Sequence, residues 1–141
     1  MNNKHGCPPG QVRVKGECIQ GIEWGFDCTH FGTAKKFKQI LLDNDLPENP
    51  RIKNHPEKKM GSYTVPASKT FIWENNKISM ETQNNPISGE YTRINARHID
   101  PGFASYIGIQ GNSPEVQKIV DDIKRATRSI KAESPCERRY I

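Results

Sequence analysis

Few side chains in this chain could move a proton, and they are spread along its length. The four histidines are His5, His30, His55 and His98. Their spacing is not that of a metal site, so each is more simply a surface or structural residue. General acid–base catalysis requires two titratable groups across a cleft. Glu90 and His98 are the best candidates for such a pair, with Glu74 as a third.

The segment that begins at Glu90 also carries cations that suit a phosphate group. Residues 90–99 are rich in Tyr, Thr and Ile, which predicts a strand. Alternation along it places Tyr91, Arg93 and Arg97 on one face and His98 on the other. Two arginines beside an aromatic ring suit contacts with phosphates and bases, and an ordinary solvated strand face would have the same composition.

The sequence predicts neither a metal ion nor a cofactor. It contains no Cys-x-x-Cys pair. Gly108 and Gly111 precede an expected helix, but a lone pair of glycines is weak evidence for a phosphate-binding loop. The N-terminus of that helix could hold an anion through its free N–H groups. Alternatively, Gly111 only lets the chain turn.

These residues would be positioned by the stretch from Glu90 to Lys131, which predicts strand, turn, strand and helix. The turn is Asp100-Pro101-Gly102, in which Pro and Gly supply the required φ angles. The strand that follows, residues 103–110, alternates. It places Phe103, Ile107 and Ile109 on one face, and Ala104, Tyr106 and Gln110 on the other.

The helix at the end of this stretch has a start signal and an apolar stripe. Ser113 is the expected N-cap, with Pro114 at the first helical position. Apolar residues then recur at helical spacing. They are Val116, Ile119, Val120, Ile123, Thr127 and Ile130.

Earlier segments predict further short elements. Residues 11–14 and 21–27 favour strands, and Thr33 is the expected cap of a helix that ends near Asp45. Residues 46–61 contain three prolines and are expected to form a basic loop that includes Lys58 and Lys59. Residues 62–65 favour a strand, and residues 70–73 and 77–81 a hairpin. The fold class is therefore α+β, with an antiparallel sheet of about four strands, an N-terminal helix and an additional C-terminal amphipathic helix.

Composition limits the size of the core and the class of partner. The chain has 141 residues, of which 33% are hydrophobic, and a mean hydropathy of −0.80. We expect a disulfide-closed arm over residues 1–21 and a single domain over residues 22–141. A net charge of +5 favours an anionic partner, and a solvated basic face explains it equally well. No apolar run of membrane-spanning length is present, so we expect no membrane partner. We also expect a monomer.

The even number of cysteines favours disulfides and an oxidising compartment. The four residues are Cys7, Cys18, Cys28 and Cys136, and three connectivities are possible. A bond between Cys7 and Cys18 would close a short loop. A bond between Cys28 and Cys136 would tie together the two ends of the domain. No apolar signal segment follows Met1, as in a mature secreted protein that begins with an added Met.

Residues 25–28, 86–91 and 97–108 form three motifs that resemble those of guanyl-specific microbial ribonucleases and, more strongly, of secreted RNase-like effectors of plant-pathogenic fungi. Residues 25–28, with Cys136, look like the aromatic-x-Cys motif and the closing cysteine of those effectors. Residues 86–91 look like the strand after the catalytic Glu of the ribonucleases. Residues 97–108 resemble the strand–turn–strand that begins with their phosphate-binding Arg. The resemblance covers residues 25–112 and implies a fungal virulence protein that is secreted and can be translocated into host cells.

The resemblance also implies that the catalytic groups are missing. The family's first His falls at Ala67, its Glu at Asn84, and its second His near Gln110 or Asn112. Only Arg97 keeps its type. Alanine and asparagine cannot transfer a proton, so the resemblance favours a pseudo-ribonuclease over an active enzyme.

Three functional hypotheses follow. The first is a secreted, non-catalytic RNase-like effector that binds host protein or RNA through Tyr91, Arg93, Arg97, Lys58 and Lys59. The second is an active endoribonuclease or ribotoxin that uses Glu90, His98 and Arg97. The third is a periplasmic binding or immunity protein.

Overall fold

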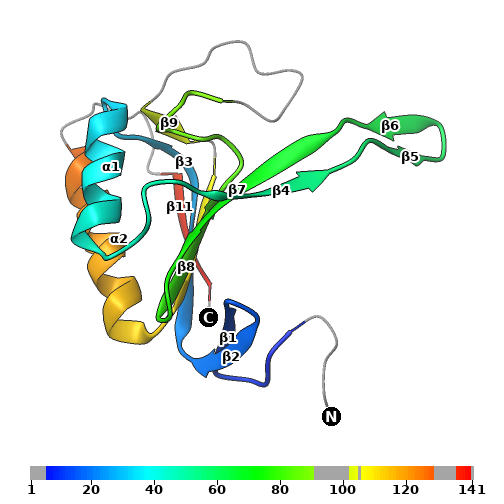
Figure 1. The fold of residues 1–141 in the computed structure, drawn as a ribbon. Coiled ribbons are helices and arrows are strands. Elements are labelled where there is room, and N and C mark those ends of the chain that lie inside the picture. Colours follow the sequence, from blue (N-terminus) through cyan, green and yellow to red (C-terminus); the bar gives the residue numbers. More distant parts are fainter. Residues whose placement is uncertain (1–5, 91–101, 105, 129–135, 141) are drawn as a thin grey trace.

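The computed structural model is an antiparallel sheet with both helices on one face (Figure 1). It describes residues 6–90, 102–104, 106–128 and 136–140, with residues 27, 28, 128 and 136–140 described by their backbone alone. The sheet has seven strands in the order β11-β3-β10-β8-β7-β4, and β9 pairs with β3 off this path. In chain order the strands are β3 (Ile22–His30), β4 (Arg51–His55), β7 (Ser68–Glu74), β8 (Ile78–Thr82), β9 (Phe103–Ala104), β10 (Ile107–Gly111) and β11 (Cys136–Tyr140).

The predicted α+β class is confirmed, and so are both helices. Helix α1 spans Ala34–Asp43, and the Thr33 hydroxyl caps it by accepting a hydrogen bond from the Lys36 N–H. Helix α2 spans Ser113–Arg128. The Asn112 carbonyl accepts the bond from the Val116 N–H, so the cap is Asn112 and not Ser113 as expected. The sheet is larger than four strands because β3, β4 and β11 also join it.

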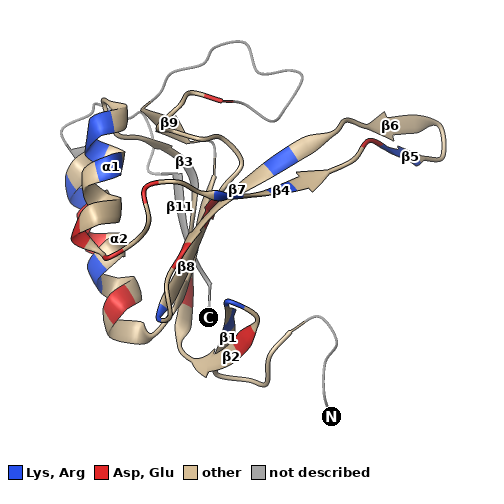
Figure 2. Cartoon of the chain, viewed as in Figure 1, with Lys and Arg blue, Asp and Glu red and all other residues tan. Residues whose placement is uncertain are grey.

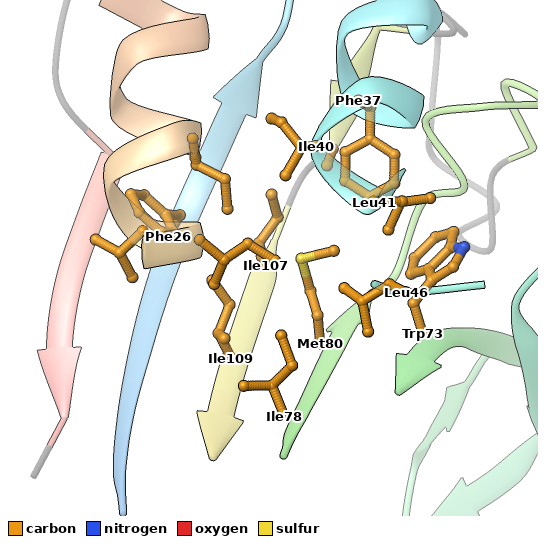
Figure 3. Close-up of a cluster of buried hydrophobic side chains, with 14 of the residues drawn as sticks. Phe26, Phe37, Ile40, Leu41, Leu46, Trp73, Ile78, Met80, Ile107 and Ile109 are labelled. Atoms are coloured by element: carbon orange, nitrogen blue, oxygen red, sulfur yellow. The ribbon is translucent and has the colours of Figure 1, made fainter. Parts of the chain in front are cut away.

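The core lies between the sheet and the two helices (Figure 3). The Phe37 ring of α1 meets the Trp73 ring of β7 edge to face, with centroids 5.1 Å apart. The apolar stripe of α2 is buried as expected, from Val116 to Ile123. Burial of these side chains is the main stabilising contribution to the fold.

The helices are also joined by a polar contact at the end of α1. The buried Asn44 side chain donates to the Ile40 carbonyl and to the Asp122 carboxylate of α2, at 2.8 and 2.9 Å. Lys118 Nζ donates back to Asn44 Oδ1 at 3.2 Å. A buried amide with several partners fixes one orientation of the two helices, because any other orientation would leave it unsatisfied.

The N-terminal segment forms a hairpin that packs against the domain. Strands β1 (Gln11–Val14) and β2 (Glu17–Gln20) pair around a turn, and a disulfide joins Cys7 to Cys18, which is one of the pairings that the sequence left open. Val12 and Val14 are buried. A Cβ on Gly21 would overlap the Gly111 carbonyl, so a glycine is required where the hairpin joins β3.

Residues 51–69 form a long ribbon that projects away from the helices (Figure 1), whereas the rest of β7 carries Phe71 and Trp73 into the core. Strands β4 and β7 pair with each other, and the chain between them forms a second hairpin of β5 (Lys58–Met60) and β6 (Tyr63–Val65). The prediction of a loop over residues 46–61 is therefore wrong. Pro50 and Pro56 lie just outside β4, at the edge of the sheet, where a missing N–H breaks no ladder.

The expected strand–turn–strand around residues 90–110 is only partly within the described residues. Tyr91, Arg93, Arg97, His98 and the turn at residues 100–101 lie outside them. The segment after the turn consists of β9 and β10. Ile107 and Ile109 face the core, whereas Tyr106 and Gln110 line the opposite face, as predicted. Phe103 and Ala104 are exceptions, because Ala104 belongs to the core and Phe103, which lies beside His30, does not.

The register of β11 and β3 places Cys136 opposite Cys28. Strand β11 pairs antiparallel with β3, and Cys136 is the Cα partner of Cys28. Directly opposed residues on antiparallel strands have Cα atoms about 4.5–5.5 Å apart, within the range of a disulfide.

We predict that the folded protein contains a Cys28–Cys136 disulfide in addition to Cys7–Cys18. Peptide mapping without reduction should recover both linked pairs, and alkylation of the denatured, unreduced protein should find no free thiol. Recovery of free Cys28 and Cys136, or of either bonded to Cys7 or Cys18, would contradict the prediction.

Candidate functional site

The face of the sheet opposite the helices presents a group of polar side chains. Strand alternation places Glu23 of β3, Glu81 of β8 and Gln110 of β10 there, because their neighbours Trp24, Met80 and Ile109 pack in or against the core. The face therefore has the acids and hydrogen-bonding groups that a polar ligand would require.

A pocket lies on this face around Glu81. Its lining residues are Glu23, Trp24, Glu81, Tyr106, Gly108, Ile109 and Gln110. Glu81 pairs with Gly108, and Gly108 pairs with Gly25. Next to Glu81 across the sheet, β10 and β3 therefore have glycines, which carry no side chain. The floor of the pocket is the backbone of these two strands.

The Tyr106 ring occupies the space above Gly108. A Cβ at position 108 would collide with the Tyr106 hydroxyl. Because Gly108 is the ladder partner of Glu81, the hydroxyl lies above the strand next to this carboxylate. The arrangement places a phenol and a carboxylate at the same pocket.

Glu81 has an altered acidity. Desolvation raises its pKa above the ordinary value of 4.5, Lys53 and His55 oppose this rise, and Glu23 adds to it. The residue remains exposed overall, so the pocket walls remove water from the carboxyl without closing it off from a ligand. A carboxyl with a raised pKa in a pocket is a candidate for binding or proton transfer.

His55 and Lys53 extend the site onto β4. His55 Nε2 is hydrogen-bonded to the Thr70 hydroxyl of β7 at 2.8 Å, which orients the ring. Lys53 is the ladder partner of Thr70 and lies on the same face. Both act electrostatically on Glu81, although 26 residues separate His55 from it in the sequence.

The other residues expected at a site have structural partners or lie elsewhere. Glu90 pairs with Lys69 Nζ at 2.7 Å, and Glu74 pairs with Arg51 at 3.1 Å. Lys58 is on the hairpin β5–β6, far from the pocket, and so is Lys59 (Figure 1). None of these four side chains lines the pocket.

The positions where the resemblance implies lost catalytic residues do not form a cluster around the pocket. Asn84 is buried, and its amide donates to the Phe103 carbonyl. Ala67 is exposed at the base of the hairpin β5–β6. Of this set, Gln110 alone lines the pocket, where its amide donates to the Arg13 carbonyl.

Sequence reasoning missed Glu81, His55 and Lys53. The alternation of Ile78 and Met80 with Ser79 and Glu81 is a signal that could have placed Glu81 opposite the core. No local signal places β4 near β8, because the pairing through β7 joins distant segments.

No metal site accompanies these groups in the part of the chain that the structure describes. No protein family model, curated protein or solved structure is significantly similar to the chain.

We predict that the pKa of Glu81, measured by NMR titration of its side-chain carboxyl, lies above 4.5. The Glu23→Gln variant should lower this pKa because a like charge is removed. Lys53→Met should raise it further because a cation is removed. A value at or below 4.5, or shifts of the opposite sign, would contradict the prediction.

The same shift has a consequence for stability. Just above pH 4.5 the folded protein retains a proton that the unfolded chain has lost. The free energy of unfolding therefore falls as pH rises through this window, up to the folded pKa. The Glu81→Gln variant should lack this fall, which urea denaturation at several pH values would measure.

Proposed function

We propose that this protein is a secreted RNase-like protein that binds RNA without cleaving it, as an effector of the kind that its sequence resembles. The RNA would contact the pocket at Glu81 and the basic ribbon, whose Lys53 and His55 act electrostatically on Glu81. The Cys7–Cys18 disulfide supports an oxidising compartment, because such bonds rarely persist in the cytosol.

The distribution of charge is the observation that carries this proposal. Residues 51–69 contain five Lys or Arg and a single acid, Glu57, so most of the net charge of +5 lies on the ribbon. Figure 2 locates these cations on β4, β5 and β7. Lys53, Lys58 and Lys59 have no carboxylate at ion-pair distance among the described residues. Unpaired lysines on β4 and β5, at intervals along the ribbon, suit the repeating phosphates of a nucleic acid.

The pocket supplies a second kind of contact. Glu81 can accept hydrogen bonds from the N–H groups of a base, and Tyr106 offers a ring for stacking at its edge. A carboxylate would repel a phosphate, so we place the phosphates along β4 and a base at the pocket. This arrangement favours RNA over a purely anionic ligand such as a free phosphate.

We expect the Lys53→Gln variant to bind a fluorescent single-stranded RNA several-fold more weakly, regardless of its sequence. The slope of log K against log salt should decrease in magnitude by about 0.7, the amount expected for one lost phosphate contact. Fluorescence anisotropy over a range of salt concentrations measures both. The matched control is Lys35→Gln on α1, which lies on the helix-covered side of the sheet.

Equal affinities for the two variants, or no RNA binding by the parent protein, would contradict the proposal. The latter result would instead favour a host protein as the partner of this surface.

An active endoribonuclease is the second candidate, and the environment of Glu81 favours it. Its raised pKa suits a general base for the 2′-hydroxyl. His55, on the same face, could protonate the 5′ oxygen that leaves as the 2′ oxygen bonds to phosphorus. This assignment replaces Glu90, which pairs with Lys69. Arg97 and His98 lie outside the described residues.

Incubation of the protein with RNA separates the two candidates. Our proposal predicts no cleavage products above those of the buffer alone. Turnover that falls about 100-fold or more in both Glu81→Gln and His55→Ala would establish the enzyme instead. Glu115→Gln on α2 is the control for a contaminating nuclease, since its products should match those of the parent protein.

A further inference from the structure

The hairpin β5–β6 exposes apolar side chains at the far end of the ribbon. Met60 is 41% exposed, Tyr63 62% and Val65 41%. Among the described residues, the other large apolar side chains with comparable exposure are Leu42 on α1 and Ile52 on β4. The tip therefore concentrates apolar surface at the point farthest from the helices (Figure 1).

The register of the hairpin gathers these side chains on one face. Met60 pairs with Tyr63, and Lys58 pairs with Val65. Paired residues share a face, and so do residues two apart on one strand. One face thus carries all four side chains, three apolar and one cationic. Lys59 points to the opposite face, with Thr64 as its partner.

We propose that this tip binds the surface of an anionic lipid membrane, with Met60, Tyr63 and Val65 in the interfacial region and Lys58 and Lys59 at the headgroups. Tyrosine is favoured at this level because its ring is apolar and its hydroxyl is polar. Lysines close behind apolar residues add attraction to anionic lipids. The positive charge of the ribbon is complementary to the negative charge of an anionic membrane.

A membrane accounts for the composition of the tip better than a nucleic acid does. A nucleic acid would use the lysines and the Tyr63 ring, but it offers no apolar partner for Met60 and Val65. The tip also projects from the domain, away from the rest of the described residues (Figure 1). A fluid interface can enclose a projecting hairpin from both faces.

The hairpin also limits how deeply the tip can enter. Strands β5 and β6 form a sheet of two strands, so the outer edge of each has no ladder partner. Unpaired backbone groups are costly in hydrocarbon, and the tip must therefore remain in the hydrated interface. Neither helix is long and apolar enough to span a bilayer in the described residues, so the contact is peripheral.

Vesicle sedimentation tests the proposal. The protein should bind vesicles of phosphatidylcholine mixed with phosphatidylserine and not vesicles of phosphatidylcholine alone. The Lys58→Gln/Lys59→Gln variant should bind about thirtyfold more weakly, as expected for two lysines near the surface. Its matched control is Lys35→Gln/Lys36→Gln, an exposed lysine pair on α1.

A second set of variants tests the contribution of the apolar side chains to membrane binding. Met60→Ser/Val65→Ser should lower binding by about tenfold or more, because apolar area is no longer transferred from water. Leu42→Ser on α1 is the control, since Leu42 is 53% exposed and lies outside the tip. The serine variant should retain RNA affinity, which distinguishes failure of this inference from failure of the proposed function.

A spectroscopic reporter tests the depth of insertion. The Met60→Trp variant should show a blue-shifted emission with mixed vesicles, relative to the parent protein with its Trp24 and Trp73. A quencher in the headgroup region should act more strongly than one at the bilayer centre. Absence of a shift, equal binding to both vesicle types, or equal effects of tip and control variants would overturn the proposal.

Discussion

Burial of one face of the sheet against α1 and α2 is the constraint on which the rest of the molecule depends. The aromatic contacts of Phe37 and Trp73, with Met80 and Ile107 beneath them, remove apolar surface from water and hold the strands in a single sheet. A strand has two faces, so every residue buried in this way fixes the orientation of its neighbours. The opposite face is left free for polar side chains and can change its chemistry without loss of the core.

The two faces of the sheet therefore differ in composition: one forms the core, and the other lines the pocket. Glu81 lies between Met80 and Thr82, both buried, and its own side chain points away from the helices. The Gly108–Gly25 pair beside it carries no side chains, and the Tyr106 ring occupies the space above Gly108. A pocket on a flat sheet requires missing side chains, because neighbouring strands otherwise fill the surface. Glycine here supplies space as well as backbone freedom.

The ribbon follows from a different constraint, since it extends beyond the helices and has no core of its own. Its strands are held by ladder hydrogen bonds and by ion pairs at its base, such as Arg51 with Glu74. Exposed ion pairs contribute little to the free energy of unfolding. Folding stability therefore does not explain the charged and apolar side chains farther out on the ribbon. Their placement is better explained by contacts with other molecules.

The sequence alone determined the local structure: both helices with the Thr33 cap, the hairpin over residues 70–81, and the cysteines that form the Cys7–Cys18 bond. The helices, the hairpin and this cysteine pair all depend on residues that are close to one another in the sequence. Tertiary structure decided that β4 is a strand, and that His55, Lys53 and Glu81 share one face. Alternation specifies which side chains share a face, but not which strand lies beside which. Strand order is decided by burial and pairing summed over the whole sheet, and no local pattern of residues encodes that sum.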